Sequence, residues 1–341
     1  MDAIVEKVQS LAKNADDKSR KDILDRLRDL SISLETPQDA MQRISYLHLQ
    51  PILVRIGCDL KLFNILTDNK DPLTLDQLSA KTSAAPLLLG NNDTIAPIIF
   101  ELPEFLAEIK YQNFTNPLHT PLQKAWKTNL PAFLWIPSRP ENHAHFNRFM
   151  EAQHRDMRQW LDVYPIEEKI QNLEPEQVLF VDVGGGIGHQ SVALRKRLPD
   201  IKNRIIVQDM EVVIAHAIVH EGVEPTVYDF YQPQPIKGAR IYYFRNIMHD
   251  YPDDKAVAIL KNIIAALGPD SVILIDDMVL PDSKVHWQAT QIDITMMSAL
   301  ASRERTVEAW SELMQKAGLK INRIYTYTES LQDSILEVVP V

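Results

Sequence analysis

The stretch Val181-Asp-Val-Gly-Gly-Gly-Ile-Gly-His189, VDVGGGIGH, decides the fold of this chain. Only 10 glycines occur in 341 residues, and four of them fall within these nine positions. Glycine permits positive φ angles and lets another molecule come close to the backbone. The apolar run VLFVDV leads into the glycines, and the amphipathic run HQSVALRKRL follows them. This order predicts a strand, a loop and a helix, with a ligand at the N-terminus of the helix.

The same alternation continues on the C-terminal side of the loop. We expect strands at 178–183, 204–208, 226–230, 239–245 and 271–276, and helices at 189–198, 212–220 and 253–267. Strands that alternate with helices of this length predict a parallel sheet covered on both faces. Two last strands, at 319–328 and 334–341, have so short a link that they must be antiparallel neighbours.

The first half of the chain has a different texture. Apolar residues recur at helical spacing from Ile4 onward, and a long apolar helix is expected at 45–66. The sequence Gly90-Asn-Asn-Asp93 is expected to break any helix there. The change of texture predicts a helical domain at 1–165 and an α/β domain at 166–341.

Composition excludes several classes of partner. The net charge of −10 and the pI near 5.5 argue against a nucleic acid or an anionic membrane surface. No run of about 20 apolar residues occurs, so no membrane span is expected. Cys58 is the only cysteine, which excludes an internal disulfide and suits a reducing compartment. A soluble, cytosolic protein is expected.

The spacing of the glycines distinguishes between ligands. A dinucleotide loop needs G-x-G-x-x-G, and His189 stands where the third glycine should be. The observed spacing, through Gly184, Gly186 and Gly188, resembles the loop with which class I methyltransferases hold S-adenosylmethionine. A tight turn without a ligand is the alternative. Asp209 ends the next strand, where a carboxylate can bind ribose hydroxyls or cap a helix.

Three further motifs carry a family resemblance. They are His249-Asp250-Tyr251, Asp277 ahead of Leu280-Pro281, and Arg303-Glu304-Arg305-Thr306. With the loop, they resemble the caffeic-acid-type O-methyltransferases, most of all their fungal secondary-metabolism branch, from about residue 35 to the end. The resemblance implies a class I, Rossmann-like α/β sheet ending in an antiparallel hairpin. A mostly helical, partial winged-helix domain for dimerisation would precede it.

The resemblance also implies site residues. His249 matches the general base, and Asp277 and Glu304 match the acids that bracket it. Positions that match the cofactor site are Asp182, Gly184, Gly185, Gly186, Gly188, Asp209, Asp229, Phe230 and Arg245. Positions that match the substrate pocket are Phe146, Met150, Asp250, Asp293 and Met297. The implied partners are S-adenosylmethionine, a small hydroxylated acceptor and a second copy of the chain.

These residue types suit methyl transfer without a metal. An imidazole near the acceptor hydroxyl can take its proton, and a carboxylate on the other ring nitrogen can stabilise the imidazolium. Asp276-Asp277 is the only close pair of acids near the site. Neighbouring strand residues point to opposite faces, so this pair does not form a metal cluster. Glu304 as a helix cap is the alternative to a catalytic role.

The sequence departs from the family pattern at three places. Tyr251 replaces a tryptophan, and Asp277 replaces a glutamate, which shortens its reach toward His249. Near 90–95 a part of the winged-helix region is missing. A DNA-binding role for that region is disfavoured by the acidic balance and by the lack of a basic face.

Three functions remain open from the residues. The first is an O-methyltransferase that acts on an aromatic or polyketide-like hydroxyl. The second is an S-adenosylmethionine-binding relative that is inert or catalyses a rearrangement or pericyclic step. The third, a nicotinamide oxidoreductase, is disfavoured by His189.

Overall fold

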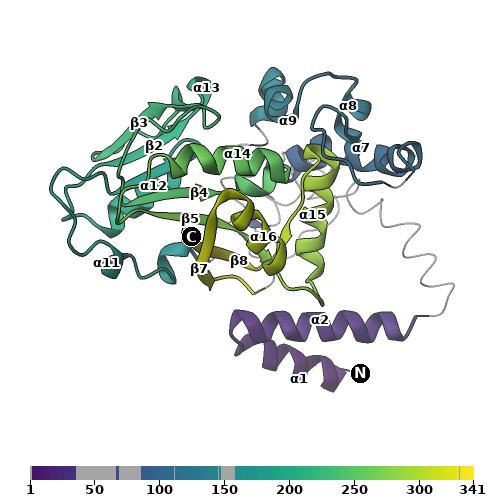
Figure 1. Ribbon diagram of the computed structural model, residues 1–341. Helices are drawn as coiled ribbons and strands as arrows, with labels where there is room; N and C mark the ends of the chain where they lie inside the picture. Colours follow the sequence, from purple (N-terminus) through teal and green to yellow (C-terminus); the bar gives the residue numbers. More distant parts are fainter. Residues whose placement is uncertain are drawn as a thin grey trace. The chain divides into compact units, whose positions relative to one another are not determined.

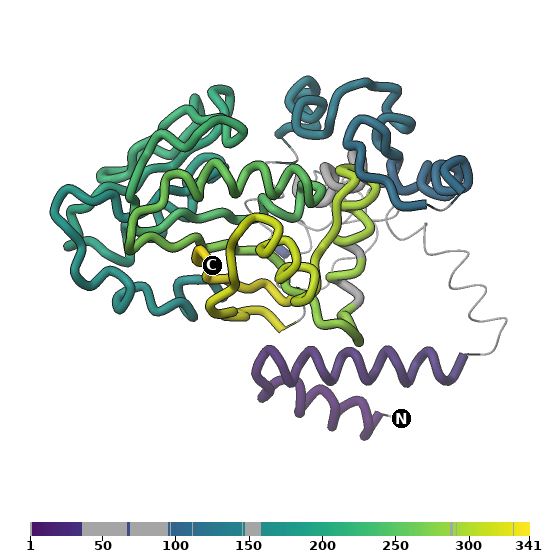
Figure 2. The backbone as a smooth tube through the Cα atoms, in the orientation of Figure 1, coloured from purple at the N-terminus to yellow at the C-terminus, as the bar shows by residue number. Residues whose placement is uncertain are grey.

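A computed structural model describes residues 2–35, 67–68, 86–110, 112–144, 146, 158–329 and 331–341 (Figures 1 and 2). Two compact units make up the chain, residues 1–96 with 136–153, and residues 97–135 with 154–341. Cys58, Met150 and the helix expected at 45–66 lie outside the described residues. The domain boundary near 165 stays a prediction.

The first unit begins with a helical hairpin. It consists of α1 (Asp2–Lys13) and α2 (Asp17–Ser33), which pack against each other (Figure 1). Asp16 caps α2 by accepting a hydrogen bond from the Ser19 amide at 2.8 Å. Neither helix buries a residue, and Leu11 and Leu30 are more than half exposed. The hairpin therefore presents apolar side chains that nothing in the described part of the chain covers.

Helix α7 (Pro86–Glu108) corrects one expectation. It runs without interruption through Gly90-Asn-Asn-Asp93, where the sequence predicts a break. One glycine costs a helix only about 1 kcal/mol relative to alanine, and asparagine and aspartate cost less. In a helix of 23 residues this local preference is overridden. Among the described residues, no helix is long and apolar enough to cross a membrane.

The second unit is built on an eight-stranded sheet. The strands along its main path are β3 (Val223–Val227), β2 (Ile205–Asp209), β1 (Phe180–Val183), β4 (Ile241–Arg245), β5 (Val272–Leu280), β8 (Asp333–Pro340) and β7 (Leu319–Thr326), in that order. Neighbouring strands among β1 to β5 pair in parallel, whereas β8 pairs antiparallel with both β5 and β7. The short β6 (Arg305–Thr306) pairs with the end of β5. The expected α/β fold with an antiparallel C-terminal hairpin is confirmed.

Helices and short turns precede the first of these strands or connect one strand to the next. The described ones are α8 (Pro121–Trp126), α9 (Ala132–Trp135), η2 (Trp160–Asp162), α11 (Ile166–Lys169), α12 (His189–Arg197), α13 (Glu211–Ile214), η3 (Met248–Asp250), α14 (Asp253–Ile264), α15 (Trp287–Leu300) and α16 (Val307–Ala317). In the first unit η1 (Ile136–Ser138) completes the set. The helix expected at 212–220 is one turn, and the strand expected at 226–230 lies at 223–227. Gly222, with φ +77°, turns the chain so that the strand begins directly after it.

Each face of the sheet carries its own core. On one face Val181, Tyr242 and Ile275 pack with residues of α14 and α16. On the other face Phe180, Tyr243 and Leu274 pack with α12 and with Trp160. Successive strand residues alternate between the cores, as the pleat requires. The side chains of Asp276 and Asp277 consequently lie on opposite faces of the sheet.

Leu313→Ala in α16 should lower the free energy of unfolding by about 2–5 kcal/mol, because it leaves a cavity in the core. Leu313 is fully buried against the sheet. Glu312→Ala, one position away on the exposed face, is the matched control and should leave stability nearly unchanged. Urea unfolding followed by tryptophan fluorescence measures both. Equal losses would contradict the described orientation of α16.

Candidate active site

The glycine loop lies between β1 and α12. Gly184, Gly186 and Gly188 adopt φ angles of +69°, +60° and +94°, which favour glycine. A Cβ on Gly185 would lie 2.5 Å from the Asp182 carboxyl carbon, so this glycine is required by close packing. A Cβ on Gly186 would meet no atom within 4 Å. The loop is therefore packed at Gly185 and open at Gly186, where a ligand can approach it.

Two carboxylates contact this loop or the helix that follows it. Asp209, at the end of β2, accepts the Gly186 amide at 2.8 Å and the Met210 amide at 2.7 Å. It does not cap α13, whose cap residue is Met210, so that alternative is wrong. Asp182 accepts the Ser191 hydroxyl at 2.9 Å, and burial raises its pKa to about 7. Asp209 therefore bonds the loop directly, whereas Asp182 packs beside Gly185 and bonds the first turn of α12.

An aromatic group stands next to the loop. A Cβ on Gly184 would lie 3.7 Å from the Phe230 ring. Phe230 makes edge contacts with Tyr231 and Tyr251, at centroid distances of 5.3 and 5.6 Å. Asp229 accepts the Tyr231 amide at 2.9 Å and fixes the turn. Tyr231 was not singled out in the sequence, since no motif marks it, although it directly follows Asp229-Phe230.

The Arg245 side chain makes an ion pair within the protein. Its guanidinium pairs with the buried Asp276 at 3.1 Å, and the Tyr327 hydroxyl donates to the same carboxylate at 2.8 Å. The Arg245 side chain is only 11% exposed. These contacts give Arg245 a fixed place in the sheet and leave its predicted contact with a cofactor untested.

His249 lies in η3, just beyond β4, and is held from two sides. Its Nδ1 is 2.7 Å from Glu304 Oε1, and its Nε2 is 3.4 Å from Asp250 Oδ1. Burial opposes the charged imidazolium, but the carboxylates of Glu304, Asp250 and Asp277 outweigh it and raise the pKa of His249 well above its usual range. Glu304 therefore contacts the imidazole, while the cap of α16 is Thr306. The alternative of Glu304 as that cap is wrong.

Asp277 acts on His249 without touching it. Both of its oxygens are buried without a hydrogen-bond partner in the described part of the chain. Burial raises its pKa to about 8, although the nearby imidazole opposes that shift. Burial likewise raises the pKa of Asp250 to about 7. The shorter side chain at 277 thus leaves Glu304 as the acid that hydrogen-bonds His249.

The remaining predicted residues are placed as follows. Asp293, in α15, accepts the Glu304 amide at 2.8 Å and so joins the His249 cluster through the backbone. Met297 is half-buried on the same helix. Phe146 belongs to the first unit. Among the described residues, no group of His, Cys, Asp or Glu is arranged to hold a metal ion.

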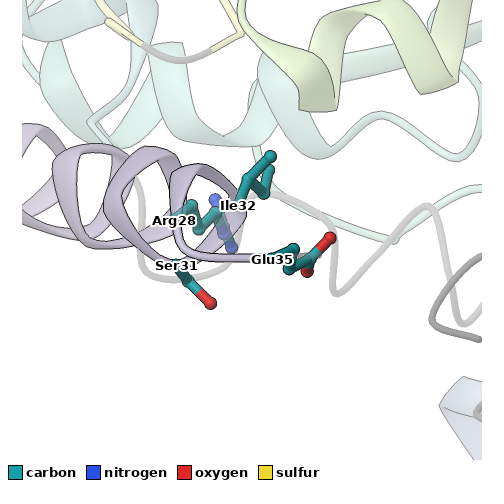
Figure 3. Close-up of a pocket in the computed structure, with 4 residues that line it drawn as sticks. All are labelled: Arg28, Ser31, Ile32 and Glu35. Carbon is teal, nitrogen blue, oxygen red and sulfur yellow. The ribbon is translucent and has the colours of Figure 1, made fainter. Parts of the chain in front are cut away.

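A pocket of about 240 Å³ lies outside this site, at the end of α2 (Figure 3). It is lined by Arg28, Ser31, Ile32 and Glu35. Arg28 donates a hydrogen bond to Asp25 at 3.2 Å, on the surface of the same helix. None of the residues predicted for the site lines this pocket.

A glycine loop over a strand end, an acid on the next strand and a buried histidine held by a carboxylate are the features of a transferase of the class I methyltransferase type. The family model for the O-methyltransferase domain matches residues 120–320. The chain belongs to this O-methyltransferase family. It is 35% identical, over 381 aligned positions, to demethylsterigmatocystin 6-O-methyltransferase of Aspergillus parasiticus, covering 100% of this chain and 98% of that one.

Solved structures show the same fold. The structures described as "A Pericyclic Reaction enzyme" and as LepI in complex with SAM each superpose with a TM-score of 0.91 and 33% identity. Both matches cover 99% of this chain and 98% of the other. O-methyltransferase lepI of Aspergillus flavus is also 34% identical over 371 aligned positions, covering 96% of this chain and 95% of that one.

Relative to the parent, the Asp277→Asn variant should become more stable as pH rises from 5 to about 8. Because the folded pKa is about 8, the folded chain keeps a proton that the unfolded chain releases above about pH 4, so stability falls through this window. Asparagine removes that dependence without losing a hydrogen bond. Melting temperatures across the pH range measure the difference.

Asp282→Asn is the control, since Asp282 is exposed just beyond the same strand. Its melting-temperature difference from the parent should stay flat across the range. A flat difference for Asp277→Asn as well would contradict a buried, protonated Asp277.

Proposed function

We propose that this protein transfers a methyl group from S-adenosylmethionine to a hydroxyl of an aromatic or polyketide-like small molecule of secondary metabolism, with His249 as general base. The observation that carries the proposal is the hydrogen bond between His249 Nδ1 and Glu304. It assigns the ring proton to Nδ1 whenever the imidazole is neutral, so that Nε2, which lies 3.4 Å from Asp250 Oδ1, then carries a lone pair that can accept the proton of the acceptor hydroxyl.

The cofactor would lie against the open side of the glycine loop. A Cβ on Gly186 would meet no atom within 4 Å, and the Gly186 amide donates a hydrogen bond to Asp209. The Phe230, Tyr231 and Tyr251 rings offer apolar edges for an adenine. The LepI structure with SAM has the same fold at 33% identity, which supports this placement. When bound, S-adenosylmethionine supplies an electrophilic methyl group on a sulfonium.

The protein then has two tasks, orientation and proton removal. A well-oriented encounter contributes roughly 7–11 kcal/mol to lowering a barrier. His249 takes the acceptor proton at Nε2, and Glu304 stabilises the imidazolium that results. Because three carboxylates raise the pKa of His249, the active neutral imidazole becomes more abundant as pH rises. The transfer rate should therefore increase with pH toward that pKa.

A second function deserves a test because of the neighbour described as a pericyclic reaction enzyme. In that case the protein would bind S-adenosylmethionine without consuming it, and would be inert toward methyl transfer or rearrange its substrate. The His249–Glu304 pair favours methyl transfer, since a proton acceptor is poised there. Radiolabelled methyl appearing in an organic product would exclude the second function.

We also propose that the protein is a cytosolic homodimer. The α1–α2 hairpin exposes Ile4, Leu11, Leu30 and Leu34, and a second copy would cover such a face. The alignment with the Aspergillus parasiticus relative runs over 381 positions against 341 residues here, so about 40 positions of that relative have no counterpart. This supports the missing segment near 90–95. Where the unmatched positions fall stays a prediction.

Gly186→Ala should weaken binding of S-adenosylhomocysteine, measured by calorimetry, by at least about tenfold, because its Cβ would occupy the ligand's space and its φ of +60° strains alanine by about 1–2 kcal/mol. Gly238→Ala is a matched control. It has φ +65° and equally open surroundings, but lies outside the loop. It should bind normally. Equal affinities in both variants would show that the cofactor does not bind at this loop.

His249→Ala should lower the rate of methyl transfer by about 10²–10⁴-fold, the usual contribution of a general base. Binding of S-adenosylhomocysteine should persist, because the loop is untouched. The exposed His216→Ala serves as the control and should keep the parent rate. Initial rates with labelled cofactor and hydroxylated aromatics measure both. An unchanged rate in His249→Ala would show that another group takes the proton.

A further inference from the structure

Arg305 is a buried arginine directly beside Glu304. Its side chain is fully buried. One guanidinium nitrogen donates to the Met248 carbonyl at 2.7 Å, and another to the Tyr251 carbonyl at 2.8 Å. These two carbonyls flank His249-Asp250, one residue on each side. A single side chain thus holds both ends of the turn that carries the histidine.

The guanidinium is itself fixed in place. Asp253, at the first position of α14, accepts from its Nε at 3.2 Å and from Nη2 at 3.0 Å. The guanidinium also lies 5.2 Å from the centre of the Trp310 ring. Its backbone is paired with Val279 of β5, two residues beyond Asp277. Arg305 therefore ties η3 to α14, α16 and the end of β5.

We infer that Arg305 is a positioning residue for the reaction, holding the backbone of η3 so that the His249 ring meets Glu304. Glu304 and Arg305 act as one unit, the first on the imidazole and the second on the turn. The consequence for catalysis rests on the proposed function, in which His249 is the base. The geometric part, a His249–Glu304 contact that depends on Arg305, does not.

Arginine is specifically required for this task. Its planar fork presents donors in a fixed geometry, so it can reach two carbonyls and a carboxylate at once. Lysine keeps the charge but offers one point donor on a flexible stem. Arg305→Lys therefore preserves the charge opposite Asp253 while releasing at least one carbonyl of the turn.

Arg303 provides a matched control. It is in the same motif and also pairs with Asp253, at 3.6 Å, but its side chain is 56% exposed. In the described contacts it has no hydrogen bond to the turn. Arg303→Lys thus disturbs the same carboxylate without touching the backbone around His249.

The experiment compares the parent, Arg305→Lys and Arg303→Lys by NMR of ¹⁵N-labelled histidine across pH, with the His249 signal assigned by its loss in His249→Ala. We expect the pKa of His249 to fall by about one unit or more in Arg305→Lys, as its contact with Glu304 loosens. Arg303→Lys should match the parent. In turnover assays kcat should fall by about 10²-fold in Arg305→Lys, with KM for the cofactor preserved.

A lower melting temperature in Arg305→Lys with an unchanged His249 titration would overturn the inference and leave Arg305 a purely structural residue. If Arg305→Lys does not fold, Asp253→Asn carries the same test, because it releases the carboxylate that orients the guanidinium. The titration needs no methyl transfer. A shifted His249 pKa together with full activity in His249→Ala would refute the general base and still support the positioning.

Discussion

Parallel pairing of β1 with β2 and β4, and of β4 with β5, is the constraint on which the site depends. Parallel strands bring their carboxyl ends to one edge of a sheet. The glycine loop follows β1, Asp209 ends β2, and His249 follows β4. Residues far apart in the chain therefore lie at the same edge of the sheet, although no single sequence motif contains them.

Burial of charge shapes the chemistry of that edge. Asp276 and Asp277 are neighbours in β5, yet the pleat sends them to different cores. The Asp276 carboxylate accepts hydrogen bonds from Tyr327 and Arg245. In the part of the chain that the structure describes, Asp277 has no hydrogen-bond donor, and burial raises its pKa to about 8. The same residue type thus accepts hydrogen bonds and an ion pair at position 276, while at position 277 it is buried without a described partner.

Sequence reasoning reached most of the fold because its signals were local. The strands β1 to β5, β7 and β8 and the helices α12 and α14 lie within a few residues of their expected positions, since periodicity and glycine turns mark them, whereas the helix expected at 212–220 is a single turn. It failed at Gly90-Asn-Asn-Asp93, where a weak propensity was taken for a helix break. It also gave Arg305 no role, because nothing in the Arg-Glu-Arg-Thr motif says which carbonyls a guanidinium will reach.

The sequence by itself determined the class of the fold, the position of the glycine loop and the identity of His249 and Glu304 as partners. These follow from glycine spacing, alternation of strands and helices, and motif resemblance. Only the tertiary structure decided that Glu304 bonds Nδ1, that Asp277 is buried with no partner among the described residues, and that Arg305 bonds both ends of the turn. Hydrogen bonds of about 3 Å depend on where η3, β5 and β6 come together, and chain order alone does not specify that distance.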